Sequence, residues 1–282
     1  MPAGTPGLWE HARVIEVRDP GDGRLADFRA LTTADRRPDR PGGKGLVIAE
    51  GVVVVRRLLA SRYPLRAVLG VPRRLEELSA DLAGRAAPVY AASAELMAEV
   101  VGFHLNRGVL AVAGRPPAPS VDGVVAGARR LAVLEGVGDH ENLGALFRNA
   151  AALGVDGVLL GAGCSDPLYR RSVRVSMGHV LAVPFAPLTP WPDGLNLLRG
   201  KGFRVLAMTP SASSVPLSDP AVSAGGAERV AVLLGSEGPG LSAGAIAAAD
   251  VAVRIPMASG VDSLNVATAG AVAFYALGTF GR

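Results

Sequence analysis

The feature that most limits the fold is a series of short, uninterrupted apolar runs in the second half of the chain. Each run has the length of a β-strand, and the runs lie at 131–134, 157–160, 181–185, 204–208, 230–234 and 251–255. Helix-length segments lie between them, at 142–153, 167–177, 191–199, 243–248 and 263–277. Continuous apolar character, rather than alternation, is typical of parallel strands covered on both faces. The pattern therefore predicts an α/β fold with a parallel sheet.

The first half of the chain predicts a smaller α/β unit. Strand-like and helix-like segments alternate from Leu46 to Ala113, which favours a compact domain of about seventy residues. Between the halves, the stretch GRPPAPSVDG from Gly114 to Gly123 holds three prolines, which disfavour both helix and sheet. We therefore expect domains at 1–114 and 125–282, joined by a linker at 115–124.

The composition narrows the class of protein. The single cysteine, Cys164, excludes an intrachain disulfide and a cysteine-rich metal cluster, and no metal is expected. The first residues show no secretory signal, and the apolar run at 264–280 is shorter than the ~20 residues that span a bilayer. We expect a soluble, cytoplasmic protein without a membrane partner. The net charge of +4 and the excess of arginine over lysine suit phosphate contacts, but do not by themselves decide for nucleic acid.

The stretch RIPMASGVDSLNVAT, from Arg254 to Thr268, is the first candidate site. It begins at the end of an apolar strand, which Pro256 stops because proline has no N–H to donate. A small-residue loop follows, and Ser263 then begins a helix with Asn265 in its first turn. Ligands in open α/β sheets bind at such strand ends. Taken alone, the stretch is equally typical of an ordinary strand–helix connection.

A second candidate site is the glycine-rich stretch LLGSEGPGLS at 233–242. Glycine permits positive φ and close approach of the backbone to a ligand. The stretch is no P-loop, since it lacks Gly-Lys-Ser/Thr, and the chain has no complete G-x-G-x-x-G dinucleotide fingerprint. Gly136-x-Gly138 and Gly161-x-Gly163 are partial matches that lack the third glycine. A nucleotide-dependent α/β enzyme of another class, such as an oxidoreductase, is therefore the alternative.

A third candidate site lies in LEGVGDHENLGALFRNAAA, at 134–152. Asn142 precedes an apolar-periodic run and predicts a helix N-cap, and Arg148 lies within two turns of it. Arg170 and Arg174 lie one turn apart on another predicted helix and form either a solvated basic face or an RNA contact. None of the four histidines stands in a hydrolase frame, so Ser263 is interpreted as a hydrogen-bonding organiser rather than a nucleophile.

In this order, the three stretches resemble the signature motifs of the SpoU/TrmH family of RNA ribose 2′-O-methyltransferases, in the SPOUT superfamily. The matched residues are Asn142, Gly144 and Arg148 in the first motif, Gly235, Glu237 and Gly240 in the second, and Ile255, Pro256, Met257, Ser263, Leu264 and Asn265 in the third. The resemblance covers roughly residues 130–280. It implies a SPOUT domain with a C-terminal trefoil knot, and a homodimer with the last helix in the interface.

The resemblance also implies a cofactor and a site. S-adenosyl-L-methionine is expected to lie between the second and third motifs, against Gly235, Gly240, Ile255, Met257 and Leu264. The implied catalytic residues are Arg148, Asn142, Glu237, Ser263 and Asn265. Arginine keeps its proton to a pH of ~12 and above. We therefore expect Arg148 to orient groups and stabilise developing charge, while a nearby RNA phosphate relays the proton.

The first half resembles the small N-terminal domain of many family members, which is similar to RNA-binding ribosomal-protein folds. The implied RNA contacts are Arg174, Arg170 and Arg107. Family members often have glutamine at the last position, so the role of Arg107 is open between an RNA contact and a loop arginine without a partner. The basic loop around 36–44 is either solvated or in contact with phosphate. The appended domain favours ribosomal RNA over transfer RNA; an RNA-binding module with an inactive site is the remaining alternative, against which the unaltered motifs argue.

Overall fold

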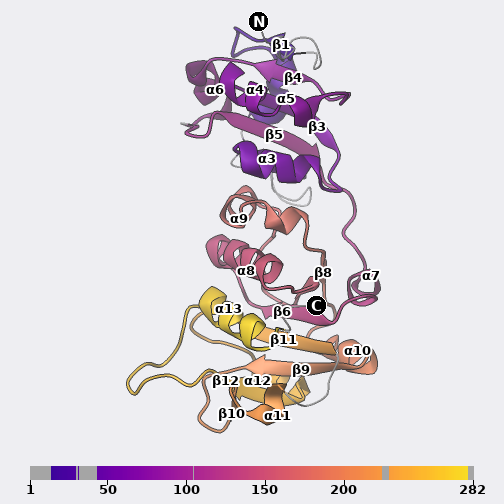
Figure 1. Ribbon diagram of the computed structural model, residues 1–282, viewed down its shortest axis with the longest axis vertical. Helices are drawn as coiled ribbons and strands as arrows, with labels where there is room; N and C mark the ends of the chain where they lie inside the picture. Colours follow the sequence, from indigo (N-terminus) through magenta and orange to yellow (C-terminus); the bar gives the residue numbers. More distant parts are fainter. Residues whose placement is uncertain (1–13, 30, 32–42, 104, 224–228, 279–282) are drawn as a thin grey trace, which may run out of the picture. The chain divides into compact units, whose positions relative to one another are not determined.

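The computed structural model describes residues 14–29, 31, 43–103, 105–223 and 229–278. The chain divides into two compact units, each taken by itself below (Figure 1). The first unit comprises Met1–Pro117 together with Leu168–Ala182, and the second comprises Ala118–Pro167 together with Val183–Arg282. Among the residues described, no helix is long and apolar enough to cross a membrane. Most of the basic loop around 36–44 lies outside the described residues.

The second unit is built on a seven-stranded sheet in which every neighbouring pair of strands is parallel. In spatial order the strands are β10 (Val215–Pro216), β12 (Val251–Arg254), β9 (Phe203–Met208), β11 (Arg229–Gly235), β6 (Arg130–Glu135), β7 (Gly157–Leu160) and β8 (Phe185–Pro187). The central strands β9, β11 and β6 are buried along most of their length. This burial confirms the parallel sheet that continuous apolar runs predict.

One predicted strand, at 181–185, is wrong. The run is divided between a 3₁₀ turn, η2 (His179–Leu181), and the start of β8 at Phe185. Pro184 lies between them, and proline cannot donate to a strand ladder. The predicted helix at 167–177 is also too long. It is reduced to α9 (Arg170–Val175), with Tyr169 at the N-cap position.

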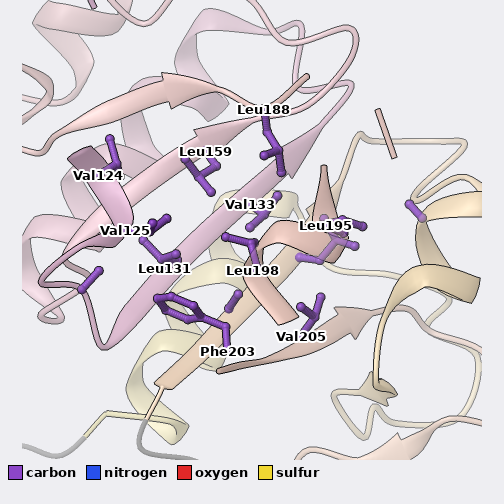
Figure 2. Packing of buried hydrophobic residues seen from close by; sticks show 14 of the residues in the cluster. Val124, Val125, Leu131, Val133, Leu159, Leu188, Leu195, Leu198, Phe203 and Val205 are labelled. Atoms are coloured by element: carbon purple, nitrogen blue, oxygen red, sulfur yellow. The ribbon is translucent and has the colours of Figure 1, made fainter. Parts of the chain in front are cut away.

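Helices cover both faces of the parallel sheet. On one face, α7 (Val121–Val125), α10 (Leu195–Gly200) and α12 (Ala243–Ala248) pack against the strands in one buried cluster (Figure 2). The other face carries α8 (His140–Ala152) and α13 (Val266–Ala276). A Cβ on Gly270 of α13 would lie 2.6 Å from Leu146 Cδ2 and 3.2 Å from Leu234 Cδ1. Glycine at this position therefore lets α13 pack closely on α8 and β11. A short helix, α11 (Pro220–Ser223), follows β10.

The first unit holds a smaller, mixed five-stranded sheet. Its strands, in spatial order, are β1 (Val14–Glu16), β4 (Val89–Ala91), β3 (Leu65–Gly70), β5 (Val109–Gly114) and β2 (Leu46–Glu50). Strand β5 is antiparallel to both of its neighbours, and the other pairs are parallel. The accompanying helices are η1 (Gly23–Phe28), α3 (Val52–Leu59), α4 (Pro72–Glu77), α5 (Ser79–Leu82) and α6 (Ala94–Val101). The alternation of strand and helix from Leu46 onward is therefore as predicted.

The division of the chain differs from the predicted domains in two respects. Residues 121–125 form helix α7 in the second unit, so they are not part of a linker. The segment 168–182, with α9 and η2, belongs to the first unit, where it packs beside the edge strand β2 and helix α3. There Arg57 Nη1 donates to the Met177 carbonyl oxygen, and a Cβ on Gly178 would meet Val54. These contacts join residues about 120 positions apart in sequence, which no local pattern predicts.

Candidate active site

A cavity of ≈ 430 Å³ opens at the carboxyl ends of three neighbouring strands of the second unit, β12, β9 and β11, where helix α13 begins. Its lining includes Gly235, Glu237, Gly240, Ile255, Met257, Ser263, Leu264 and Asn265 from the predicted site. Crevices at strand carboxyl ends are the usual ligand sites of open parallel sheets. The volume falls within the range of small-molecule and cofactor sites. The second and third predicted stretches are therefore brought together around one cavity.

Residues 235–241, which we call the glycine loop, form one wall of this cavity. The loop is a narrow hairpin, closed by the hydrogen bond from Gly240 N to the Ser236 carbonyl oxygen at 3.1 Å. A Cβ on Gly235 would overlap the backbone of Gly240 and Leu241 and would lie 2.6 Å from the Gly240 carbonyl oxygen. Gly238 and Gly240 have φ values of +85° and +70°, which side-chain-bearing residues rarely adopt. The glycines are thus required by the shape of the loop itself.

Asn265 joins the predicted stretches by hydrogen bonds. Its Nδ2 donates to Asn142 Oδ1 at 2.8 Å and to Glu237 Oε1 at 2.6 Å. Its Oδ1 accepts from the backbone nitrogens of Ala267 at 2.9 Å and Thr268 at 3.2 Å. The helix cap fixes which end of the amide is oxygen, because only an acceptor can receive two backbone N–H groups. The nitrogen must therefore face Asn142 and Glu237.

Two predicted helix starts need correction. Asn142 is not the N-cap of its helix: Asp139 is, and its carboxylate accepts from the backbone nitrogens of Glu141 and Asn142. Asp and Asn are equally good caps, so the pattern could not choose between them. Helix α13 begins at Val266 with Asn265 as the N-cap, which leaves Ser263 in the loop before the helix, where it lines the cavity.

Arg148 lies on α8, is exposed, and does not line the cavity. Among the described residues it has neither an ion pair nor a hydrogen bond through its guanidinium. Asn142 lies on the same helix and reaches the cavity edge through Asn265. Its Oδ1 accepts from Asn265, so its own amide N–H groups are available to a further acceptor. Helix α8 thus carries Asn142, with unused N–H donors at the cavity edge, and the exposed cation Arg148, which lies outside the cavity lining.

The three arginines predicted to contact RNA all belong to the first unit. Arg170 is held in place, with its guanidinium 4.3 Å from the centre of the Phe103 ring. Arg174 is exposed on α9, and Arg107 is exposed beside the Gly51 turn, where its Cδ would lie 2.8 Å from a Cβ on Gly51. Within the described residues, the guanidinium groups of Arg107 and Arg174 pair with no carboxylate.

A third strand end at the cavity is not among the predicted sites. Met208, Thr209 and Pro210 line it from the end of β9. Strand β9 lies between the two strands that carry the recognised stretches, and this sheet order is not visible in the sequence. The apolar run followed by Thr-Pro is the signal that the sequence offers for this strand end.

The Sγ atom of Cys164 donates to the Leu134 carbonyl oxygen at 3.3 Å, and burial raises the pKa of this thiol.

Comparison with known proteins decides the family. The model of the SpoU rRNA methylase family matches residues 129–275. The chain belongs to this family. An uncharacterized tRNA/rRNA methyltransferase of Mycobacterium tuberculosis is 63% identical over 262 residues, covering 93% of this chain and 91% of the relative. The 23S rRNA (guanosine(2553)-2′-O)-methyltransferase of Bacillus subtilis is 30% identical over 153 residues, covering 54% of this chain and 59% of the relative.

A solved structure agrees with this assignment. The AdoMet-bound rRNA methyltransferase from Sinorhizobium meliloti superposes with a TM-score of 0.78 at 25% identity, covering 94% of this chain and 98% of that one. This chain is accordingly an RNA methyltransferase with S-adenosyl-L-methionine as its cofactor. The cavity fits such a cofactor, because glycine backbone and apolar side chains such as Ile255, Met257 and Leu264 line it together with a few polar groups.

Proposed function

We propose that this chain transfers a methyl group from S-adenosyl-L-methionine to a ribose 2′-hydroxyl of structured ribosomal RNA. The observation that carries the proposal is the Asn265 amide. It lies at the cavity edge and hydrogen-bonds both Glu237 of the glycine loop and Asn142 of helix α8. A cofactor wall and a helix with free donors are thus fixed relative to each other by one side chain. Methyl transfer to a hydroxyl requires such fixed placement, because the acceptor oxygen must lie in line with the bond that breaks.

The bound cofactor would supply a methyl group on a positively charged sulfur. The chain supplies a wall for it through Gly235 and Gly240, and apolar contacts through Ile255, Met257 and Leu264. The Glu237 carboxylate, oriented by Asn265, places a negative charge at the same cavity, which suits a cationic ligand. Ser263 lines the cavity from the loop before α13 and offers a hydroxyl for hydrogen bonding. No covalent enzyme intermediate is needed for this transfer.

Arg148 is proposed to serve the acceptor RNA rather than the cofactor. It is exposed on α8 and does not line the cavity. A guanidinium keeps its proton at any physiological pH, so it acts as a donor to phosphate or to the developing alkoxide. The 2′-hydroxyl proton leaves through a nearby RNA phosphate, as expected above. Asn142, one helical turn and a half earlier, offers its amide N–H groups to the same nucleotide.

The first unit is proposed to bind the RNA. Most arginines in the described chain already donate to a carboxylate or a carbonyl, as Arg56 does to Asp81 and Arg66 to Asp27. Arg107 and Arg174 have no such partner there, so their guanidinium groups are available to phosphates, which arginine binds in bidentate fashion. Arg170 is the weaker candidate, because the Phe103 ring already covers it. Ribosomal RNA is favoured over transfer RNA by this appended unit, and the relative from Bacillus subtilis is named for that substrate.

A homodimer is proposed as the assembly, with α13 in the interface and a trefoil knot formed by the C-terminal third. Helix α13 carries no charged residue, and Val272 and Tyr275 are 38% and 66% exposed. The nearby loop adds Val261 and Leu264, at 49% and 38% exposed. Exposed apolar residues gathered on neighbouring segments are typical of a surface that another protein covers. Sedimentation of the full chain tests this, and a monomer at micromolar concentration would remove the dimer from the proposal.

The decisive experiment supplies labelled S-adenosyl-L-methionine and unmodified ribosomal RNA to the full chain. Methyl incorporation is then mapped by resistance of the adjacent linkage to alkali, which a 2′-O-methyl group confers because it removes the attacking hydroxyl. Parallel reactions contain, in place of the ribosomal RNA, either transfer RNA or DNA with the sequence of the ribosomal RNA. We expect labelled, alkali-resistant ribosomal RNA and inert DNA, since DNA lacks the acceptor hydroxyl. Label on a base, or on transfer RNA alone, would overturn the proposed acceptor or substrate. A chain that binds RNA but transfers no methyl group would be an RNA-binding module with an inactive site.

A further inference from the structure

We propose that Glu135 is a positioning residue for cofactor binding, and that it acts with Trp191 to hold the returning arm of the glycine loop. Glu135 is outside the recognised motif positions and does not line the cavity. The inference rests on the proposed function in one respect, because it takes the cavity to be the S-adenosyl-L-methionine site. It adds the mechanism by which the wall of that site keeps its shape.

The Glu135 carboxylate ties together the two ends of the loop. Glu135 is the last residue of β6 and pairs in register with Gly235, where the loop begins. Its Oε2 accepts from the backbone nitrogen of Ser242, directly after the loop, at 2.8 Å. Ser242 in turn caps α12, with its Oγ accepting from Ala245 N at 3.2 Å. One carboxylate therefore anchors the loop exit to the strand beside the loop entry.

Trp191 completes the anchor. Its indole Nε1 donates to Glu135 Oε1 at 2.6 Å. The ring is itself held by packing, because a Cβ on Gly161 would lie 2.6 Å from Trp191 Cζ3, which leaves no room for a side chain there. The next residue, Pro192, lies at ordinary contact distance from where a Cβ on Gly244 of α12 would be. Both carboxylate oxygens thus face a donor, and hydrogen bonds to an ionised acceptor are the stronger kind.

Loop position and cavity shape are coupled through the backbone. Gly235 lies against Gly240 and Leu241 so closely that no Cβ fits, and Ser236 is bridged to Gly240. The lining includes Gly235, Ser236 and Gly240. A shift of the returning arm would therefore move the entry arm with it. Removing the Glu135 acceptor should change the wall of the cavity without removing any group that touches the cofactor.

The test compares Glu135→Gln with Asp156→Ala, because the Asp156 carboxylate anchors the other end of β6. Asp156 Oδ2 accepts from the backbone nitrogens of Arg129 and Arg130 at the start of β6. Asp156→Ala therefore removes an acceptor that holds the same strand, away from the cavity. The Gln variant keeps the size of Glu135 but can accept through one oxygen only, so one donor faces an NH₂ group. Binding of S-adenosylhomocysteine to the full-length protein is measured by calorimetry, and thermal unfolding is followed in parallel.

We expect Glu135→Gln to weaken S-adenosylhomocysteine binding by roughly tenfold, the usual size of one lost hydrogen bond to a charged group. Asp156→Ala should lower the melting temperature and leave the affinity within about twofold of wild type. If Glu135 only stabilised the fold, the two variants would lose affinity to a similar extent. Trp191→Phe, which keeps an aromatic ring but removes the indole donor, should weaken binding by a smaller factor and add little to Glu135→Gln.

Wild-type affinity in Glu135→Gln, or equal loss of affinity in Asp156→Ala, would overturn this inference and leave the proposed function intact. If wild-type protein fails to bind S-adenosylhomocysteine, the proposed cofactor site falls instead. The two failures are therefore distinguishable from the same set of titrations. A Glu135→Gln protein that unfolds in the titration is replaced by Trp191→Phe, for which wild-type affinity would equally count against the proposal.

Discussion

Replacement of Asn265 by aspartate separates the two tasks of this side chain. The cap of α13 needs an acceptor, and an aspartate oxygen can take the Ala267 and Thr268 N–H groups as Asn265 Oδ1 does. The bridge needs a donor, and aspartate has none when ionised. The variant should therefore keep the helix start while it breaks the contacts to Asn142 and Glu237.

The magnitude for stability is small because the terms offset each other. Asp and Asn cap about equally well, and a negative charge at a helix start adds ~0.3–1 kcal/mol. A second carboxylate then replaces the nitrogen that lies 2.6 Å from Glu237 Oε1. Both side chains are exposed, so water replaces the lost hydrogen bond between them at little cost to stability, and their repulsion in water is on the order of 1 kcal/mol. The free energy of unfolding should change by less than about 1 kcal/mol, against a loss of ~1 kcal/mol from the cap alone in Asn265→Ala.

The magnitude for activity is larger. Loss of a hydrogen bond to a charged group costs ~1.5–3 kcal/mol, or roughly 10–100-fold in rate if it is needed in the transition state. Asn149→Asp is the matched control, because Asn149 Nδ2 donates to the Ala267 carbonyl oxygen at 2.9 Å on the packed side of the same helix start. We expect Asn265→Asp to lose kcat/KM for ribosomal RNA at near-wild-type stability, and Asn149→Asp to lose stability at near-wild-type kcat/KM. Wild-type turnover by a stable Asn265→Asp protein would refute the argument that the bridge fixes the site.

Three further predictions address single residues. Arg148→Ala should keep wild-type affinity for S-adenosylhomocysteine and lose turnover by roughly 10–100-fold. The control Arg129→Ala removes another exposed arginine, next to the start of β6, and should keep both affinity and turnover. Unchanged turnover in Arg148→Ala would remove Arg148 from the site. Gly235→Ala should lower cofactor affinity by more than tenfold in calorimetry, since its Cβ meets backbone that cannot yield, whereas Gly244→Ala meets only Pro192 Cγ at 3.4 Å and should bind normally. Burial raises the pKa of Cys164, so the folded state holds the thiol proton more tightly. Iodoacetamide should therefore label the folded protein far more slowly than the urea-unfolded chain at pH ~8. The contribution of this raised pKa to the free energy of unfolding should decrease as the pH rises through it. Equal labelling rates by mass spectrometry would contradict the partial burial of this thiol.

Much of the site could be predicted from sequence because its residues are required by local chemistry. Glycine at 235 and 240 follows from a hairpin with no space for side chains or with positive φ. A polar side chain near a helix start is predicted at Asn265, but its place as the N-cap, rather than in the first turn, is not. Helix caps and strand boundaries that local chemistry does not determine agree less well with the prediction. Asp139 and Asn142 are equivalent cap candidates in sequence, and only the hydrogen bonds show that Asp139 is the cap. The prediction of a strand at 181–185 is wrong because Pro184 interrupts the apolar run and cannot donate a hydrogen bond to a strand ladder.

Long-range arrangement accounts for the rest. The end of β9 lines the cavity because β9 lies between β12 and β11, and strand order depends on how the whole sheet pairs. The segment 168–182 lies between two stretches of the second unit in sequence, yet it packs with the first. Its attachment depends on pairs such as Arg57 with Met177, or Arg170 with Phe103. Such pairs join ordinary residues with no motif, so periodicity and spacing have no access to them.

The strand order also explains why cofactor binding and turnover should respond to different substitutions. The carboxyl ends of β9 and β11, the loops that follow β9, β11 and β12, and the start of α13 supply the cavity lining, and all of these segments come from the last third of the chain. Strand β6 and helix α8 contribute no lining residue, yet β6 carries the Glu135 anchor and α8 carries Asn142 and Arg148. Asn265 is a hydrogen-bond link between these two groups of elements at the cavity edge. Changes within the lining should therefore act on cofactor affinity, changes on α8 should act on turnover, and changes at Asn265 should act on the coupling between them.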